Sequence, residues 1–316
     1  MTMKPLGMLA LALVGTLGSS RALADASSLN DNLGPREVAI GEALRADARG
    51  SLAITLNPAG LTLSHELVFE GSYGYRPGDG ASAASVSACD STGRIPGCYY
   101  YRYFRAAPDI GGTDFNHRSH EFGMVLAYPI APSLSLGVNS KYFDYNSDLM
   151  GESDASGFAF DAGATFHASD VLNLGVVGYN LEHANTPQYP RAIGAGFAVR
   201  PVPSLALAAD GVWNIELPKG ESTGRYGGGA EYFLSGRNMQ SGYPLRLGGV
   251  YDVNQHAGYI TAGVGYMTAK VGLDIAMRKQ LSGEQMDGTR ELMITASIRV
   301  FGPRMAAQST SPFAAQ

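Results

Sequence analysis

The sequence predicts an all-β fold, a transmembrane antiparallel up-and-down β-barrel of about 12 strands with an N-terminal hatch inside its lumen. Three observations predict it. Charged residues make up only 16% of the 316-residue chain, whereas about a quarter is usual in a soluble domain. Apolar and polar residues alternate repeatedly with a period of two, as in barrel strands that face lipid on one side. Long and short connections also alternate between these strands, as extracellular loops and periplasmic turns do in bacterial barrels.

Residues 1–24 have the features of a secretory signal peptide. Lys4 gives a positive start, residues 6–17 form an apolar run too short to span a bilayer, and Ala22 to Ala24 form a small-x-small cleavage site. We expect export and cleavage after Ala24, and a buried N-terminal helix is the alternative. Cleavage removes two basic residues and takes the formal net charge from −5 to −7. This acidic balance argues against nucleic acid as a partner.

Alternation marks the strands of a barrel domain over residues 66–301. In GFAFDAGATFHAS, for example, Phe158 and Phe160 share one face and Asp161 lies on the other. The predicted strands lie near 66–76, 118–131, 133–146, 157–168, 171–183, 191–200, 204–215, 224–235, 244–253, 258–267, 270–281 and 291–301. Twelve is an even count, which places both ends of the barrel on the periplasmic side. Residues 99–106 are a further candidate strand, and pairing with one more would give fourteen. We expect residues 302–316 to form a flexible periplasmic tail.

The chain contains two cysteines, Cys89 and Cys98, on either side of a turn that contains glycine and proline. An exported protein meets an oxidising compartment, so we predict a disulfide worth about 2–3 kcal/mol, with two free thiols as the alternative. We place the disulfide in a long, exposed, aromatic-rich loop over residues 77–116. No metal site is predicted, because too few suitable ligands surround the cysteines and His117 and His120 diverge at what we expect to be a solvated loop.

Charged residues also occur on the inward faces of the predicted strands. These candidate lumen-lining residues are Glu70, Lys141, Asp161, Asp210, Glu231, Arg246, Asp274 and Arg278, with Asp252 and Arg299 beside them. Their mixed signs favour a water-exposed lumen that is cross-linked by ion pairs and holds a plug in place, and a selectivity lining is the alternative. No catalytic constellation and no cofactor site stand out, so we do not expect an enzyme.

The run IGEALRADARGSLAITLNPAGL (residues 40–61) precedes the first strand and belongs to a predicted hatch over residues 25–65. Pro35 can begin a helical turn over residues 36–48, Pro58 makes Asn57 extended, and Gly60 supplies a turn. A barrel of twelve strands is about 24 Å across and leaves a lumen of about 12–14 Å, which one helix nearly fills. The alternative is a disordered periplasmic leader.

This run resembles the N-terminal hatch of the FadL-type outer-membrane barrels, including the shorter PorV/PorQ-like branch. The matching positions are Gly41, Ala43, Ala46, Ala53 and the hatch motif Asn57, Pro58, Ala59, Gly60 and Leu61. Glu42 stands where a second glycine is common, and Arg49 stands where an acid is common. The resemblance implies an outer-membrane barrel plugged by its hatch. Its fatty-acid and aromatic-hydrocarbon members bind apolar molecules and release them sideways, whereas PorV-like members are partners of secretion machinery.

We therefore expect a barrel in the bacterial outer membrane, surrounded by membrane lipid, through which small hydrophobic molecules pass under control of the hatch. The second hypothesis is a barrel that transports nothing and anchors or docks a surface or secretion complex. The predicted loop over residues 77–116 is its best support. A third, less favoured hypothesis is an intramembrane hydrolase, for which the sequence pairs no nucleophile with a base.

Overall fold

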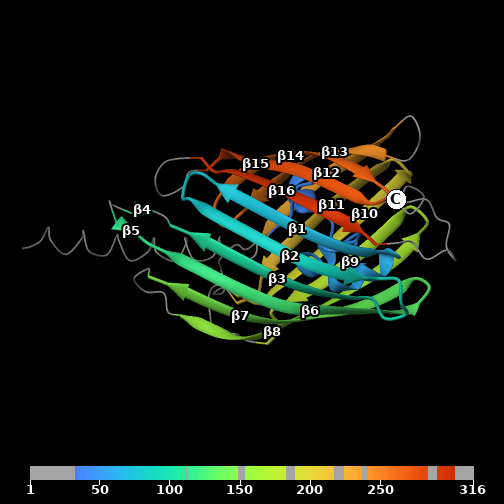
Figure 1. Cartoon of the computed structure of the whole chain (residues 1–316), viewed down its shortest axis with the longest axis horizontal. Helices are drawn as coiled ribbons and strands as arrows, with labels where there is room; N and C mark the ends of the chain where they lie inside the picture. The colour runs from blue at the N-terminus through green and yellow to red at the C-terminus, as the bar shows by residue number, and fades with distance from the viewer. Residues whose placement is uncertain are drawn as a thin grey trace, which may run out of the picture.

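In the computed structural model, fourteen strands close into a barrel around several short helices (Figure 1). The structure describes residues 33–107, 109–110, 113–148, 154–182, 189–216, 224–236, 241–283 and 290–302. The predicted signal peptide, the first part of the predicted hatch (25–32) and nearly all of the predicted tail (303–316) lie outside these residues.

The barrel is an up-and-down sheet in which each strand pairs antiparallel with its neighbours along the chain, and β1 pairs with β16 to close it. Its strands are β1 (Leu67–Arg76), β2 (Ala81–Asp90), β3 (Gly97–Ala106), β6 (His117–Ala131), β7 (Leu134–Ser147), β8 (Ala155–Ser169), β9 (Leu172–Tyr179), β10 (Ala192–Val202), β11 (Leu205–Asn214), β12 (Arg225–Ser235), β13 (Ser241–Asp252), β14 (Ala257–Thr268), β15 (Val271–Ser282) and β16 (Leu292–Phe301). The short strands β4 (Asp109–Ile110) and β5 (Thr113–Asp114) form a separate ribbon.

The prediction of twelve strands is wrong, and the alternative of fourteen is confirmed. The two additional strands are β2 and β3, which occupy half of the region that we expected to be an exposed loop. β2 has the sequence ASAASVSACD, with alanine and serine on both faces, so its hydrophobic pattern does not reveal it. It nevertheless pairs along its whole length with β1, from Leu67 opposite Asp90 to Arg76 opposite Ala81.

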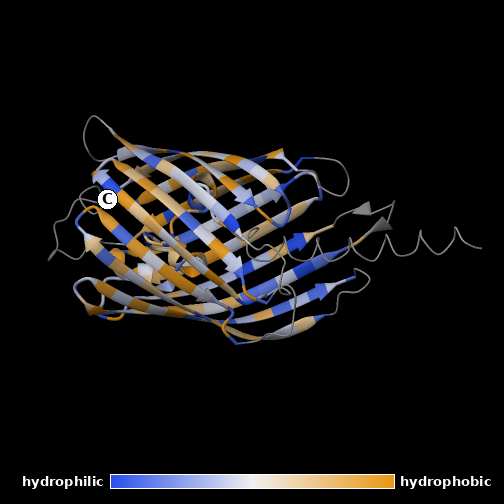
Figure 2. Cartoon of the chain, turned by 180° about the vertical axis from the view of Figure 1, so that it is seen from behind, coloured by the Kyte–Doolittle hydropathy of each residue, from blue (hydrophilic) through white to orange (hydrophobic). Residues whose placement is uncertain are grey.

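The two faces of the barrel differ in chemistry, and hydrophobic and hydrophilic residues alternate along its strands (Figure 2). Large apolar side chains such as Phe122, Phe158 and Leu247 are about 60% exposed on the outside. Charged side chains such as Lys141 and Asp161 are buried on the inside. An apolar exterior around a polar interior is the pattern of a barrel in a lipid bilayer. Among the described residues, no helix is long and apolar enough to cross a membrane.

Residues 33–64, which we call the luminal segment, lie inside the barrel and appear in blue in Figure 1. They contain α2 (Pro35–Ala39), α3 (Leu52–Thr55) and the 3-10 helix η1 (Pro58–Leu63). α2 packs against β13 to β16, and η1 packs against β6, β7 and β8. Most of the segment is buried, and the side chains of Val38 and Leu61 have no exposed surface.

The predicted helical turn over residues 36–48 is confirmed only at its start, because α2 ends at Ala39. Gly41 and Glu42 follow with φ angles of 69° and 63°, in the left-handed region where a right-handed helix cannot continue. Fourteen strands also enclose a wider lumen than twelve, since barrel diameter grows with strand number to about 28 Å here. Several short turns of chain fill this width where a single helix would not.

The predicted disulfide between Cys89 and Cys98 is present, and it joins residues that lie opposite each other in β2 and β3. Its predicted place in an exposed loop is wrong. The two cysteines are 1% and 0% exposed, and they cluster with Ala53, Ile54 and Leu61 of the luminal segment. The disulfide therefore forms part of the wall against which this segment packs.

Candidate functional site

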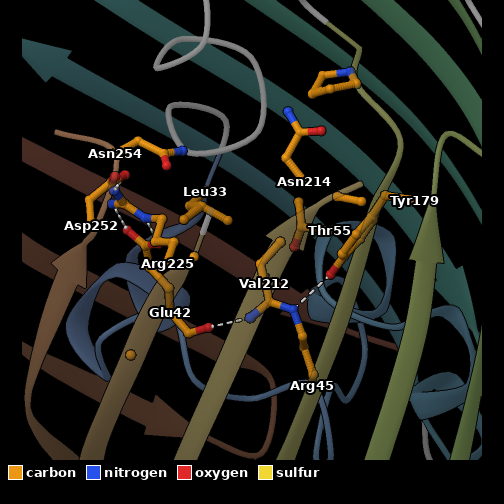
Figure 3. A pocket seen from close by; sticks show the side chains of 14 residues that line it. Leu33, Glu42, Arg45, Thr55, Tyr179, Val212, Asn214, Arg225, Asp252 and Asn254 are labelled. Atoms are coloured by element: carbon orange, nitrogen blue, oxygen red, sulfur yellow. Dashed lines mark hydrogen bonds and ion pairs between the residues drawn. The ribbon is translucent and has the colours of Figure 1, made fainter. Parts of the chain in front are cut away.

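The candidate site is the contact between the luminal segment and the barrel wall, together with a small cavity at one end of it. The cavity has a volume of about 90 Å³ and lies where β9, β11 and β13 end and β10 and β12 begin. This is the barrel end opposite the start of β1 and the finish of β16. The main polar lining residues are Glu42, Arg45, Thr55, Tyr179, Asn214, Arg225, Asp252 and Asn254 (Figure 3).

Glu42 links the luminal segment to two strands of the wall. Its carboxylate accepts two hydrogen bonds of 2.7 Å from Arg225 and one of 2.9 Å from Arg278. Arg225 also donates to Asp252 at 2.9 Å. Burial alone would raise the pKa of Glu42, but the two guanidinium groups outweigh burial and lower it to about 2. Glu42 is therefore ionised at neutral pH.

The backbone of Glu42 explains why a glycine is common at this position in the resembling family. A left-handed φ costs a residue with a Cβ about 1–2 kcal/mol, and glycine avoids this cost. In this chain the ion pairs with Arg225 and Arg278 hold the strained residue in place. The ion pairs of Glu42 thus offset the cost of its backbone conformation and attach the luminal segment to the wall.

Arg45 joins the segment to β9 and β11. Its backbone N–H donates to Asp210 at 2.7 Å, and its guanidinium donates to Asp210 at 3.1 Å and to the Tyr179 hydroxyl at 2.9 Å. Figure 3 shows the Arg45 side chain directed toward Tyr179. The Tyr179 hydroxyl in turn donates to the carbonyl oxygen of Leu56 at 2.6 Å. Two strands therefore contact two separate parts of the luminal segment.

A second ion-pair network lies deeper along β12 to β16. Arg36 on α2 pairs with Glu231 at 3.0 Å, and Arg246 bonds the same carboxylate at 2.6 Å. Arg246 continues to Asp274 at 2.5 Å, and Asp274 pairs with Arg299. This network of alternating charges connects α2 to β12, β13, β15 and β16.

The wall is built from glycines where the turn after α2 touches it. A Cβ on Gly41 would lie 2.6 Å from the carbonyl oxygens of both Gly228 and Gly249. A Cβ on Gly248 would lie 2.5 Å from the backbone nitrogen of Gly41. Real Cβ atoms do not approach other atoms so closely, so the two backbones meet directly because both lack side chains at this point.

The hatch motif, residues 57–61 of the luminal segment, makes contacts on the other side of this segment. The Asn57 amide donates to the carbonyl oxygens of Arg45 at 2.8 Å and Ala164 at 3.1 Å, and its side-chain oxygen accepts from the N–H of Ala59 at 3.1 Å. Asn57 is extended before Pro58, with φ −164°. Gly60 lies within η1, where its missing Cβ allows contact with Ala48, and it does not supply the turn that we expected.

The structure brings five of the eight candidate lumen-lining residues into ion-pair networks with the luminal segment. These are Asp210, Glu231, Arg246, Asp274 and Arg278. Lys141 and Asp161 pair with each other at 2.8 Å on neighbouring strands. Glu70, the eighth candidate residue, accepts a hydrogen bond from the hydroxyl of Ser51 in the luminal segment. The other seven residues are ion-paired. Their charges therefore mainly cross-link the interior of the barrel and are not open to a passing solute.

Sequence reasoning missed Arg36, Arg45, Arg225 and Tyr179. Arg36 and Arg45 lie among alanines and glycines of the luminal segment, and our prediction concentrated on those small residues. A basic residue beside an apolar stripe was the signal that could have found them. His117 was also misjudged, because it begins β6 and is 7% exposed. Among the described residues, no group of three or more His, Cys, Asp or Glu side chains could hold a metal ion.

The protein is thus a plugged barrel, a closed barrel whose lumen is filled by its own N-terminal chain. No protein-family model and no curated protein match this sequence. Solved structures do match its fold. The CymD monoaromatic hydrocarbon channel gives a TM-score of 0.65 at 13% identity, over 89% of this chain and 100% of that one.

Two further channels agree. The Pseudomonas putida toluene transporter TodX gives a TM-score of 0.63 at 13% identity, over 87% of this chain and 99% of its own. A Pseudomonas aeruginosa FadL homologue gives 0.60 at 11% identity, with the same coverage. The chain therefore has the fold of the FadL-type outer-membrane channels, as the resemblance of its N-terminal run predicted.

Proposed function

We propose that this protein is an outer-membrane channel for small hydrophobic molecules, and that its luminal segment is the hatch that gates it. The observation that carries the proposal is the match in fold to channels over nearly their whole length, combined with a lumen filled by residues 33–64. Two of those channels are described as carrying toluene or monoaromatic hydrocarbons. A common fold alone does not fix the cargo, so the cargo needs its own test.

The location follows from the two faces of the barrel and from the predicted leader. The apolar exterior suits the outer membrane, and lipid is then the partner of this surface. The predicted signal peptide over residues 1–24 would take the chain across the inner membrane.

The cavity beside Glu42 and Arg45 indicates a closed channel. Its volume of about 90 Å³ is smaller than the roughly 150 Å³ of an apolar cavity that holds benzene. Its lining also includes the charged side chains of Glu42, Arg45, Arg225 and Asp252, and placing an apolar molecule there would bury these groups without replacing their hydration. A monoaromatic molecule therefore passes only after the luminal segment has moved, so the segment acts as the gate.

Uptake by whole cells tests the proposed cargo. Cells that express the protein should take up toluene, or a fluorescent apolar dye, faster than cells with an empty vector. Faster migration of the unboiled protein on SDS gels would verify that equal amounts of folded barrel are compared. Uptake that equals the vector control, with folded barrel present, would contradict the proposal.

The second hypothesis, docking of a surface or secretion complex, has lost its best support. Residues 77–116 were to form an exposed loop, but half of them form β2 and β3 of the wall, and the disulfide faces the lumen. Co-purification of a stable, stoichiometric protein partner, together with unchanged uptake of the apolar dye, would restore this hypothesis.

A further inference from the structure

Two arginines lie side by side on the outer face of the barrel, near the end opposite the start of β1. Arg105 of β3 and Arg118 of β6 are opposite each other in the antiparallel ladder, and both are exposed (Figure 1). Their chain neighbours Phe104 and His117 are buried, so the arginines point outward, because successive side chains of a strand point to opposite faces. Residues directly opposite each other have Cβ atoms about 4.5–5.5 Å apart. Two positive charges therefore share one small area of the outer surface.

Neither arginine forms an ion pair with an acid that the structure describes. Arg105 donates a hydrogen bond of 3.1 Å to the side-chain oxygen of Asn116, which is neutral. Asp144 of β7 is on the same outer face, but it lies opposite His120 and pairs with neither arginine. The two positive charges are thus not neutralised by the described part of the chain.

The arginines on the inner face of the barrel are arranged differently. On the same strand as Arg105, Arg102 points inward and pairs with Glu121, and on β13 Arg246 pairs with Glu231. Like charges directly opposite each other destabilise a sheet. An anion from outside the chain would remove this repulsion between Arg105 and Arg118.

The position of the arginines along the barrel matches the level of lipid headgroups. Farther along the outer face of β6 lie Phe122 and Ile130, which are 62% and 56% exposed. With a rise of about 3.4 Å per residue and a tilt of about 40°, these two residues are about 21 Å apart along the membrane normal, close to the apolar band of about 25 Å in such barrels. Arg118 lies about 10 Å beyond Phe122 by the same geometry. The arginines are therefore just outside the hydrocarbon.

Aromatic side chains on the same outer face support this level. Tyr103 lies opposite His120 in the ladder, next to the two arginines, and the centroids of their rings are 5.0 Å apart. The hydroxyl of Tyr101 is 2.8 Å from Nδ1 of His120. Tyrosine is enriched where membrane meets water, since its ring is apolar and its hydroxyl is polar. The surface thus changes from apolar to aromatic to cationic toward this end of the barrel.

We propose that Arg105 and Arg118 together bind a phosphate group of a phosphorylated lipid in the outer leaflet. A guanidinium group presents paired N–H donors that match phosphate oxygens, and two such groups side by side can hold one phosphate. Since fourteen is an even count, both ends of the barrel sheet lie on the periplasmic side, and the arginines face the outer leaflet. The occupant is a lipid because the acyl chains below its headgroup would cover the exposed ring of Phe122. This inference rests on the proposed location in the outer membrane, and it is independent of transport.

Native mass spectrometry of the full-length protein tests the site. Protein released from detergent should retain lipid A, a phosphorylated glycolipid of the bacterial outer leaflet, at least about tenfold better than the same lipid without its phosphates. Arg105→Gln and Arg118→Gln should each weaken retention of lipid A about fivefold, and the double variant about thirtyfold. Arg94→Gln is the matched control, because Arg94 is an exposed arginine between β2 and β3 at the other end of the barrel, and it should retain lipid A as wild type does.

Three outcomes would overturn the proposal. Wild type might retain lipid A equally well with and without its phosphates, a comparison that needs no variant. The double variant, with folding verified by gel mobility of the unboiled sample, might retain lipid A as wild type does. Excess inorganic phosphate might displace lipid A completely, which would show a site for free phosphate. Toluene uptake tests the proposed function separately: protein that binds lipid A without raising uptake would contradict transport alone, and loss of lipid A binding in the double variant would still support the site.

Discussion

The two sides of the luminal segment are attached to the barrel in different ways. Toward β9 to β16, arginine–carboxylate pairs attach it through Glu42, Arg45 and Arg36. Toward β1 to β3, it meets the apolar cluster around the disulfide and a small cavity whose lining includes hydroxyls, Glu37 and Glu70. Breaking a buried ion pair leaves a bare charge and costs several kcal/mol, whereas apolar contacts have no fixed direction. The two sides of the segment therefore differ in the kind of contact that holds them.

Of the substitutions that test this difference, Glu42→Gln should have the largest effect on the free energy of unfolding. The change leaves Arg225 and Arg278 with one carboxylate partner fewer, and we expect it to lower the free energy of unfolding by about 3 kcal/mol. Urea unfolding of the protein in lipid vesicles at neutral pH would measure the loss. An unchanged unfolding midpoint would mean that the charged side does not hold the segment. In wild type, this contribution should be lost only in strong acid, as pH falls toward the lowered pKa of about 2.

Asn57→Ala should have the next largest effect, because Asn57 connects the charged side to β8. Removing its amide leaves the buried carbonyl oxygens of Arg45 and Ala164 without this donor. We expect a loss of about 2 kcal/mol in the free energy of unfolding, by the same urea experiment. Asn57→Asp serves as a sharper variant, since it keeps the size of the side chain, removes the donor and should destabilise at least as much.

Gly248→Ala tests the direct backbone contact on the charged side. Its Cβ would meet the backbone nitrogen of Gly41, and we expect a loss of about 1–2 kcal/mol together with faster leakage of dye. Gly71→Ala in β1 is the matched control, because a Cβ there has no atom within 4 Å. Equal behaviour of the two variants would show that the glycine wall does not position the segment.

Glu37→Gln should give the smallest change, and in the opposite direction. Removing a buried charge that burial and Glu70 disfavour should stabilise the protein at alkaline pH by on the order of 1 kcal/mol, the scale of repulsion between like charges about 4 Å apart in water. The gain should vanish at acid pH, where the wild-type carboxyl is already protonated. Unfolding curves of wild type and variant at both pH values would measure the gain in stability. Destabilisation of the variant at alkaline pH would contradict the interpretation that the charge of Glu37 is unfavourable.

How far the sequence predicts the structure depends on how strongly each strand alternates. The strands from β6 to β16 lie within a few residues of their predicted ranges, because large apolar residues on one face contrast with polar residues on the other. β2 was missed because alanine and serine give no such contrast. Its strand partner β3 then lacked a neighbour, so the disulfide was assigned to a loop.

The ion pairs of the site could not be predicted from one sequence. Glu42 and Arg225 are 183 positions apart, and their contact depends on barrel closure, strand register and the turn after α2 together. Alternation did indicate which charged side chains face inward, and five of them belong to ion-pair networks that include the luminal segment.

Vesicle permeability tests the central claim, that the luminal segment closes the barrel, most directly. Full-length protein and protein lacking residues 25–60 would be placed in dye-loaded vesicles, with gel mobility of unboiled samples used to match the amounts of folded barrel. We predict background leakage from the full-length protein and rapid leakage from the shortened one. Equal leakage from two folded barrels would contradict the claim.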